Sequence, residues 1–337
     1  MDIACIDIDR PSGHPAARHV TSPRAQPQGG RPEVTLNARA SASRAARIAL
    51  AGVIISAATT NPLLAAGPPP QASAAFDQYV AQAEARIQRE ESAADTFLGL
   101  GAFPAPSTDA IESRLRRGEI VVSSGGITPV QVPGGLVHHW VGIVFIPQAT
   151  IAQLFDILQN YNQMARYYSP DVAASRLLKR HGDDFQFSMR FREHKIVTVM
   201  LDGLYDVRYG RLDPAHQFSV SHSMQMVEVS DDRQTSEADV SGPSDSTEPT
   251  RGTDHGFLWR TNAYWRFEQA DDGVFVEFES ISLSRDVPTG WGWLIEPFIR
   301  EIPRESLVFT LRATRKAVLA DSASSAAASQ IELQHRP

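Results

Sequence analysis

Cysteine is almost absent from this chain of 337 residues, in which the only one is Cys5. A single thiol cannot form a disulfide within the chain, and it cannot supply the paired Cys ligands of a structural zinc site. Cys5 also precedes a segment that we expect to be removed, which would leave the mature protein without a thiol nucleophile. These absences favour non-covalent interactions over thiol chemistry.

The short sequence patterns of the commonest enzymes are also missing. The chain contains no HExxH, GxSxG or GxGxxG pattern, and no Gly-rich loop is followed by Lys-Ser or Lys-Thr. Most metalloproteases, α/β-hydrolases, dehydrogenases and P-loop enzymes show one of these patterns. The sequence therefore predicts no catalytic residue, no metal ligand and no cofactor.

The excess of acidic residues argues against binding to nucleic acid. The chain has 32 Lys and Arg against 39 Asp and Glu, a formal net charge of −7. Residues 1–66 hold seven Arg and four acidic residues, so the remainder has 25 basic and 35 acidic residues and a net charge of about −10. An acidic protein repels a phosphate backbone, and we expect no nucleic-acid partner.

The segment 44–66 has the order of residue types found in a secretory signal peptide. Arginines precede an apolar run at 48–58, and the small residues Ala65 and Ala66 follow it. This order predicts export to the periplasm or the cell exterior, with cleavage before Gly67. The apolar run is too short to cross a bilayer comfortably. An uncleaved, weak membrane anchor is the alternative.

Residues 1–43 do not fit the short basic region that opens such a signal. The stretch is long, rich in proline and without hydrophobic periodicity. It is therefore either a disordered extension or the product of a start site assigned too far upstream. In the second case Val34 is a candidate initiator, because valine codons can initiate translation in bacteria.

The region 67–135 has the pattern of a helical arm followed by a linker. Apolar residues recur at helical spacing between 71 and 100, where Ser73 is the expected N-cap, and a second short helix is expected at 109–117. Gly and Pro then mark loops around a short strand at 119–123. We expect the arm to pack on the domain that follows. A lid or a partner-binding element is the alternative.

The region 136–319 presents strand and helix signals in a fixed order. A strand at 136–146 is followed by a helix at 150–168 and then by six segments with an alternation of period two. An antiparallel sheet with one apolar and one solvent-exposed face produces such an alternation. The polar stretch 231–256 interrupts the series as a disordered insert, and the tail 320–337 is also expected to be disordered.

The last long apolar pattern, at 290–319, predicts a helix laid across this sheet. Pro303 lacks a backbone donor, so two parts are expected: a short helix at 293–300 and a main helix that begins at Pro303. A sheet with one such helix to cover it curls around the helix, and the gap between them is a natural apolar cavity. Glycines beside Trp291 and Trp293 would let the first part move over the cavity mouth.

This order of elements resembles the START-like, or helix-grip, superfamily, also described as the polyketide cyclase/dehydrase and lipid transport group. The segments GFLWRTNAYWRFEQ and GVFVEFESISLSRDVP and the terminal helix are similar to those of exported bacterial members. The resemblance implies an α+β fold in which a curved antiparallel sheet of about seven strands wraps around a long C-terminal helix. It also implies binding of a sterol, phospholipid, quinone, polyketide or plant hormone under that helix, and in some members cyclase or hydrolase activity.

We expect the ligand to be a hydrophobic small molecule or a lipid, and the exposed tryptophans of the last helix to make transient contact with a membrane surface. An apolar cavity needs only shape, burial and one or two polar anchors to bind such a ligand. The candidate lining residues on the inner strands and the last helix are Trp140, Phe187, Met189, Leu201, Tyr205, His222, Met224, Trp265, Trp291, Phe298 and Phe309.

Two other functions stay open from the sequence. An enzyme of the cyclase or hydrolase kind would use His222 or an inward-facing Arg, and it would need two polar groups that converge in the cavity. An interaction module would have the same cavity filled by its own side chains. The volume and polarity of the cavity distinguish the three hypotheses.

The ionisable residues of the strands have simpler interpretations. His138 and His139 are adjacent on one strand, so they point to opposite faces and cannot share a metal ion. The strand arginines, together with Glu277 and Glu279, predict cross-strand ion pairs on the solvent-exposed face.

Overall fold

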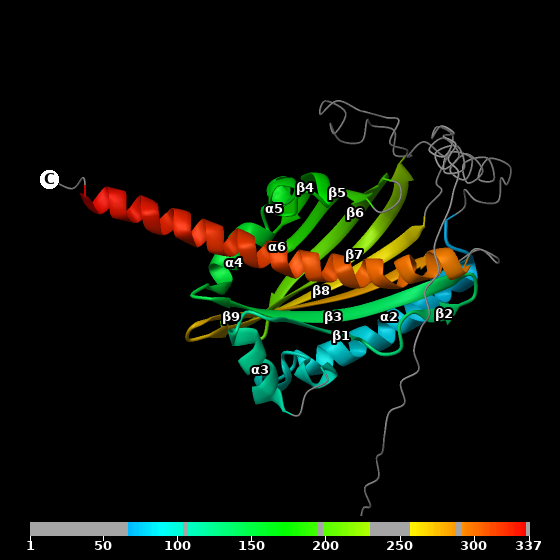
Figure 1. The fold of residues 1–337 in the computed structure, drawn as a ribbon, viewed down its shortest axis with the longest axis horizontal. Helices are drawn as coiled ribbons and strands as arrows, with labels where there is room; N and C mark the ends of the chain where they lie inside the picture. Colours follow the sequence, from blue (N-terminus) through cyan, green and yellow to red (C-terminus); the bar gives the residue numbers. More distant parts are fainter. Residues whose placement is uncertain (1–66, 104–106, 195–197, 230–256, 287–291, 335–337) are drawn as a thin grey trace, which may run out of the picture. The chain divides into compact units, whose positions relative to one another are not determined.

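The structure, a computed structural model, describes residues 67–103, 107–194, 198–229, 257–286 and 292–334 (Figure 1). The expected extension at 1–43, signal at 44–66 and insert at 231–256 lie outside these residues, as does Trp291. The side chain of Phe298 lies outside the described part as well.

One antiparallel sheet of nine strands forms the centre of the fold (Figure 1). Its order is β1-β3-β9-β8-β7-β6-β5-β4, and β2 also pairs with β3. The strands are β1 (Ile120–Ser124), β2 (Val130–Val132), β3 (Gly135–Pro147), β4 (Val172–His181), β5 (Asp184–His194), β6 (Thr198–Arg211), β7 (His216–Val229), β8 (Leu258–Ala270) and β9 (Gly273–Arg285). The predicted fold class is confirmed, with nine strands in place of about seven. Part of the excess comes from the region predicted as arm and linker, because β1 and β2 both pair with β3.

A long helix, α6 (Gly292–Gln334), crosses the face of the sheet that we call the inner face (Figure 1). Leu307, Leu311 and Val318 of this helix pack against Val144 and Phe267 of the central strands. The short helices α4 (Ile151–Leu158) and α5 (Met164–Tyr167) pack on the same side. This is the helix-on-sheet arrangement that the sequence predicts.

Gly142 of β3 determines how closely α6 approaches the sheet. A Cβ atom at this position would lie 2.5 Å from Cδ2 of Leu307 and 2.8 Å from Cδ1 of Leu311. Both leucines are buried. The missing side chain therefore lets α6 approach the sheet closely at this position.

The N-terminal arm covers the opposite, outer face of the central strands. Phe76 and Ile87 of α2 (Pro70–Glu90) pack with Val137 of β3 and Ile281 of β9, which alternate with the inner-face residues of those strands. Helix α3 (Thr108–Arg116) packs similarly on the next part of β3. The expectation that the arm packs on the domain is confirmed. The expectation of a solvent-exposed second face is wrong for β3, β8 and β9, because the arm covers them.

The first helix of the arm begins and ends at other residues than the sequence predicts. Helix α2 begins at Pro70 without a side-chain cap, and Ser73 lies within its first turn. It ends at Glu90 rather than near Leu100, and two short 3-10 turns follow, η2 (Ala94–Thr96) and η3 (Leu100–Ala102). The early end brings the backbone of these turns back to the sheet, where it bonds to buried charged side chains described below.

The region predicted as one helix at 150–168 is divided. Helix α4 has a capping box made by Thr150 and Gln153, and it ends where Asn160 leaves the helical conformation with φ −85° and ψ 64°. The turn η4 (Tyr161–Gln163) and helix α5 follow. The new direction carries Tyr161 and Met164 into the core.

Helix α6 is continuous where two parts were expected. It runs through Pro303 and onward to Gln334, so the predicted restart at Pro303 is wrong, as is the predicted disordered tail up to Gln334. A proline removes only one backbone donor, and the buried residues of the next four turns hold the helix on the sheet. The segment that follows Ala320 is rich in alanine, the residue with the highest helix propensity.

Candidate functional site

The centre of the inner face keeps contact with solvent although α6 crosses above it. Trp140 on β3, Ser280 on β9 and Ala263 on β8 lie opposite one another across three central strands, and all three are only half-buried. Phe309 of α6 is also half-buried. A central strand residue beneath a helix stays accessible only where helix and sheet do not touch. Helix and sheet are therefore less closely packed around Trp140 than at Gly142.

Small hydroxyl side chains line this part of the inner face. They alternate with the outward-facing residues of three neighbouring strands, namely Ser219, Ser221 and Ser223 on β7, Thr261 on β8, and Ser280, Ser282 and Ser284 on β9. At the other end of the sheet valine, isoleucine and phenylalanine fill the same layer beneath α6. Serine fills less volume and offers both a donor and an acceptor. The signal for this region in the sequence is a run of three serines at alternate positions in β7 and another in β9, which the predicted list of lining residues does not include.

His138 adds an imidazole to this hydroxyl-lined region. It is an inner-face residue of β3, it is buried, and its Nε2 lies 2.9 Å from Oγ of Ser284. His139 points to the opposite face, as predicted for adjacent residues of a strand. The inner face therefore carries a polar group at one end and aromatic side chains at the other.

The structure places most of the described candidate residues on the inner face. Phe187 stacks between Tyr161 and Tyr205, with ring centroids 4.3 Å and 5.0 Å away, so this part of the face is filled by the protein's own side chains. Leu201 is buried, and Met189 and Phe309 pack against this aromatic cluster. Trp140 and Trp265 lie in the half-buried centre of the inner face. Trp140 and Trp265 are therefore more accessible to solvent than Phe187 and Tyr205, which are buried.

The placement of His222 and Met224 in the cavity is wrong. Nε2 of His222 lies 2.7 Å from Oε1 of Glu84 in α2, on the outer face, and Met224 is 53% exposed. The period-two pattern put both on one face with Phe218, Val220 and Met226. Met226 instead lies on the inner face, because a register shift between β6 and β7 interrupts the alternation before it. The outer face is apolar because the arm partly covers it, whereas the serines of β7 point inward. The enzymatic hypothesis loses His222 as its cavity acid for the same reason.

A cluster of buried charges fixes the arm to the outer face. Arg266 of β8 is 1% exposed and forms ion pairs with Glu277, with Glu279 at 3.4 Å and with Glu90 of α2 at 2.6 Å. It also donates to the carbonyl oxygen of Phe97 at 3.1 Å. The predicted cross-strand Arg–Glu pairing is confirmed. The predicted solvent exposure of these pairs is wrong, because the arm buries them.

A second layer of hydrogen bonds surrounds this ion cluster. The backbone N–H of Gly99 donates to Oε2 of Glu277 at 2.8 Å, and Arg86 of α2 pairs with Glu279. Nε2 of His139 lies 2.6 Å from Oε1 of Glu279, and its Nδ1 lies 2.9 Å from the hydroxyl of Tyr79. Groups from α2, from the turns after it and from β3 and β8 thus converge on two buried carboxylates of β9.

Burial and charge act in opposite directions on these carboxyls. Burial raises the pKa of Glu277 to about 7, although the charge of Arg266 opposes the shift. Burial would also raise the pKa of Glu279, but the hydrogen bond from His139 and the charges of Arg86 and Arg266 hold it below its ordinary value. Burial by itself would lower the pKa of Arg266. The negative charges of Glu277, Glu279 and Glu90 nevertheless raise this pKa above its ordinary value.

The raised pKa of Glu277 predicts a pH dependence of stability. The folded protein keeps this proton between about pH 4.5 and pH 7, where the unfolded chain releases it, so the free energy of unfolding falls as pH rises through this window. One pKa unit corresponds to about 1.4 kcal/mol, which gives a fall of ~3 kcal/mol over the full window. Glu277→Gln keeps the shape and cannot titrate. Urea unfolding at pH 5 and pH 7.5 should show a smaller fall for this variant than for the wild type, and parallel curves would contradict the assignment.

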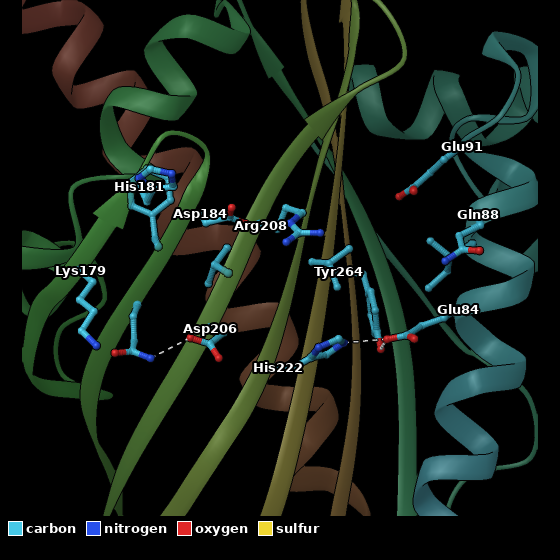
Figure 2. A pocket seen from close by; sticks show the side chains of 15 residues that line it. Glu84, Gln88, Glu91, Lys179, His181, Asp184, Asp206, Arg208, His222 and Tyr264 are labelled. Carbon is cyan, nitrogen blue, oxygen red and sulfur yellow. Dashed lines mark hydrogen bonds and ion pairs between the residues drawn. The ribbon is translucent and has the colours of Figure 1, made fainter.

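An open groove lies beside this ion cluster, between the end of α2 and the outer face of β4 to β8 (Figure 2). Its volume is about 630 Å³. The residues that line it include Glu84, Gln88 and Glu91 from α2 and Lys179, Asp206 and Tyr264 from the sheet. No local pattern in the sequence predicts this groove, because it depends on how α2 crosses the strands.

Two further properties concern only the part of the chain that the structure describes. No three His, Cys, Asp or Glu side chains in it are grouped so that they could hold a metal ion. No helix in it has an apolar stretch long enough to cross a membrane.

No protein-family model matches the chain, and no curated protein matches it either. Solved structures do show similarity. A STAR-related lipid transfer protein from Xanthomonas axonopodis is 20% identical, with a TM-score of 0.41 over 59% of this chain and 93% of that one. The Zhui aromatase/cyclase from Streptomyces sp. R1128 is 13% identical, with a TM-score of 0.36 over 54% and 93% of the two chains. Human STARD10 is 10% identical, with a TM-score of 0.37 over 69% and 86%.

Proposed function

We propose that this chain, which has the START-like helix-grip fold, binds an amphipathic small molecule or a lipid between the inner face of its sheet and helix α6. The observation that supports this is the half-buried centre of the inner face, where Trp140, Ala263 and Ser280 keep contact with solvent, which we take to mark a gap under α6. A fully packed interface would bury all three, as it buries Val144 and Phe267.

The lining of this region favours a ligand with two kinds of surface. Trp140 and Trp265 offer flat apolar contact for a ring system or an acyl chain. The serines of β7 and β9 and the imidazole of His138 offer hydrogen bonds to a hydroxyl or carbonyl group. Each buried methylene contributes about 0.8 kcal/mol, so about ten of them approach the ~8 kcal/mol of micromolar binding before ordering costs. The ligand we propose is therefore mainly apolar with one polar end.

Export and membrane contact belong to the same proposal. The basic, apolar and small residues of 44–66 are the sole support for export to the periplasm or the cell exterior. Trp291 and Trp293, in the segment where the sequence predicts the entry to the last helix, are the side chains that we propose for transient contact with a lipid surface. An exported carrier of an apolar molecule has use for both properties.

A substitution that fills the gap should abolish binding without unfolding the protein. We expect the full chain to bind the apolar fluorophore N-phenyl-1-naphthylamine with micromolar affinity. Ser280→Phe places a ring in the gap beside Trp140 and should weaken binding at least tenfold. Ser188→Phe, on the outer side of β5, is the matched control and should bind as the wild type does. Fluorescence titration measures the affinities, and circular dichroism checks the fold of each variant.

Native mass spectrometry of protein purified without detergent gives an independent test. We expect a co-purified lipid or other apolar molecule on the wild type and less of it on Ser280→Phe. A wild-type protein that carries no such molecule and binds no fluorophore would contradict the proposal. Equal binding by the two serine variants would place the ligand elsewhere.

A further inference from the structure

The outer groove contains a buried carboxylate that the fold leaves without a partner. Glu91 immediately follows α2, its side chain is 9% exposed, and it lines the groove (Figure 2). Its Oε1 is buried, and no described residue forms a hydrogen bond with it. An unsatisfied buried carboxylate is costly. Either this cost has no compensation or something outside the chain supplies a donor.

The neighbouring carboxylates of α2 are fully engaged. Glu84 accepts hydrogen bonds from Nε2 of His222 at 2.7 Å and from the hydroxyl of Tyr264 at 2.9 Å. Glu90 pairs with Arg86 at 2.8 Å and with Arg266 at 2.6 Å. Glu91 therefore stands apart from these two acids, because the cations that satisfy them do not reach its Oε1.

The other walls of the groove limit what can enter. Ile87, Val220 and the ring of Tyr264 offer apolar surface next to Glu91. The far wall carries two cations, Lys179 and Arg208, and two carboxylates, Asp184 and Asp206. Arg208 is paired with Asp184 at 2.7 Å. The charges of the far wall therefore balance, and the carboxylate of Glu91 is the group that favours a positive charge on the ligand.

We propose that the groove binds a small organic monocation, a primary amine or an amidine on an apolar body, whose nitrogen donates to Glu91. Charge-assisted hydrogen bonds to a carboxylate are about twice as strong as neutral ones. The apolar body would lie on Ile87 and Val220. This site is on the opposite face of the sheet from the gap under α6, so it does not depend on the function proposed above.

The affinity of the groove for a cation should change with pH as the carboxyl group of Glu91 loses its proton. Burial raises the pKa of this carboxyl to about 7; Arg266 opposes the shift, and Glu277, Glu90 and Glu279 add to it. A cation binds the carboxylate form, so affinity should rise as pH increases through 7. The other titratable and charged groups that face the groove or the ion cluster are Glu84, Arg86, Lys179, His181, Asp184, Asp206, Arg208 and His222.

Calorimetric titration of the full chain tests the site with named probes. Benzylamine and benzamidine should bind at pH 8 at least tenfold more tightly than benzyl alcohol, the neutral analogue. Their affinity should drop at pH 6. Glu91→Gln should remove both the preference for the cation and its pH dependence. Glu112→Gln, on α3 and outside the groove, is the matched control and should change neither.

A second variant guards against a simple folding defect. Gln88 is exposed on the rim one turn before Glu91, and Gln88→Arg would place a guanidinium within reach of the carboxylate. It should block benzylamine while the circular dichroism spectrum and the binding of N-phenyl-1-naphthylamine stay unchanged. Equal affinity for benzylamine and benzyl alcohol, or benzylamine binding that survives in both Glu91→Gln and Gln88→Arg, would overturn the proposal.

Discussion

Replacing Arg266 by methionine is expected to lower the free energy of unfolding by about 3–5 kcal/mol, as for other buried ion pairs that lose one partner. The variant keeps the volume of the side chain but removes the charge at the centre of the outer-face ion cluster. Glu277 and Glu279, both at most 1% exposed, then face each other with less compensation. Guanidinium unfolding at pH 7, followed by circular dichroism, measures the loss.

The same strand offers a control for this experiment. Arg260 also lies on the outer side of β8 and pairs with Asp77, but these side chains are 29% and 61% exposed. Exposed pairs contribute about 0–1 kcal/mol, so Arg260→Met should cost little. The double variant Arg266→Met with Glu277→Met should recover part of the loss, because it removes a buried charge along with its partner. Equal losses for the two arginine variants would show that burial of the ion cluster has no energetic consequence.

Gly142→Val is expected to displace helix α6 and to destabilise the protein by about 1–3 kcal/mol, the usual cost of overpacking a core. Its Cβ atom would lie 2.5 Å from Cδ2 of Leu307 and 2.8 Å from Cδ1 of Leu311. Because this contact sets the height of the helix above the sheet, the variant should also alter binding of N-phenyl-1-naphthylamine. Thermal unfolding and fluorescence titration measure the two effects.

A compensating substitution makes this second prediction specific. Leu307→Ala alone should cost about 2–5 kcal/mol by leaving a cavity. Combined with Gly142→Val it should cost less than the sum of the two single changes, because the valine fills the space that the leucine vacates. Gly101→Val is the control, since a Cβ atom there meets nothing within 4 Å. Strict additivity would contradict the close contact between Gly142 and Leu307.

The order of elements and the division of strand residues between two faces could be predicted from the sequence. Alternation with period two is a local property, and it correctly grouped His222 with Phe218, Val220 and Met224. Which face α6 covers is not a local property. Apolar residues mark any covered face, and the arm, which comes from a distant part of the chain, covers the face opposite α6.

The ion cluster and the outer groove were beyond prediction for a related reason. Arg266, Glu277 and Glu279 are ordinary strand residues in the sequence. Charged residues of a strand usually lie on its solvent-exposed face. They become buried only because the chain after Glu90 turns back, so that Gly99 and Phe97 bond to them. Long-range contacts of this kind leave no local pattern. The serines that face α6 did leave one, and the search for apolar residues passed over it.

The central strands bury polar groups on both of their faces, and this affects how the strands can pair. A strand that slipped by one residue would turn every side chain to the other face. Glu277 and Glu279 of β9 would then point at the leucines of α6, and Val276 or Phe278 would replace Glu277 opposite Arg266. An all-apolar sheet would tolerate such a slip far better, since its two faces would be alike. The buried charges and the serines thus distinguish the correct register of β3, β9 and β8 from registers shifted by one residue. They do so whatever they contribute to stability.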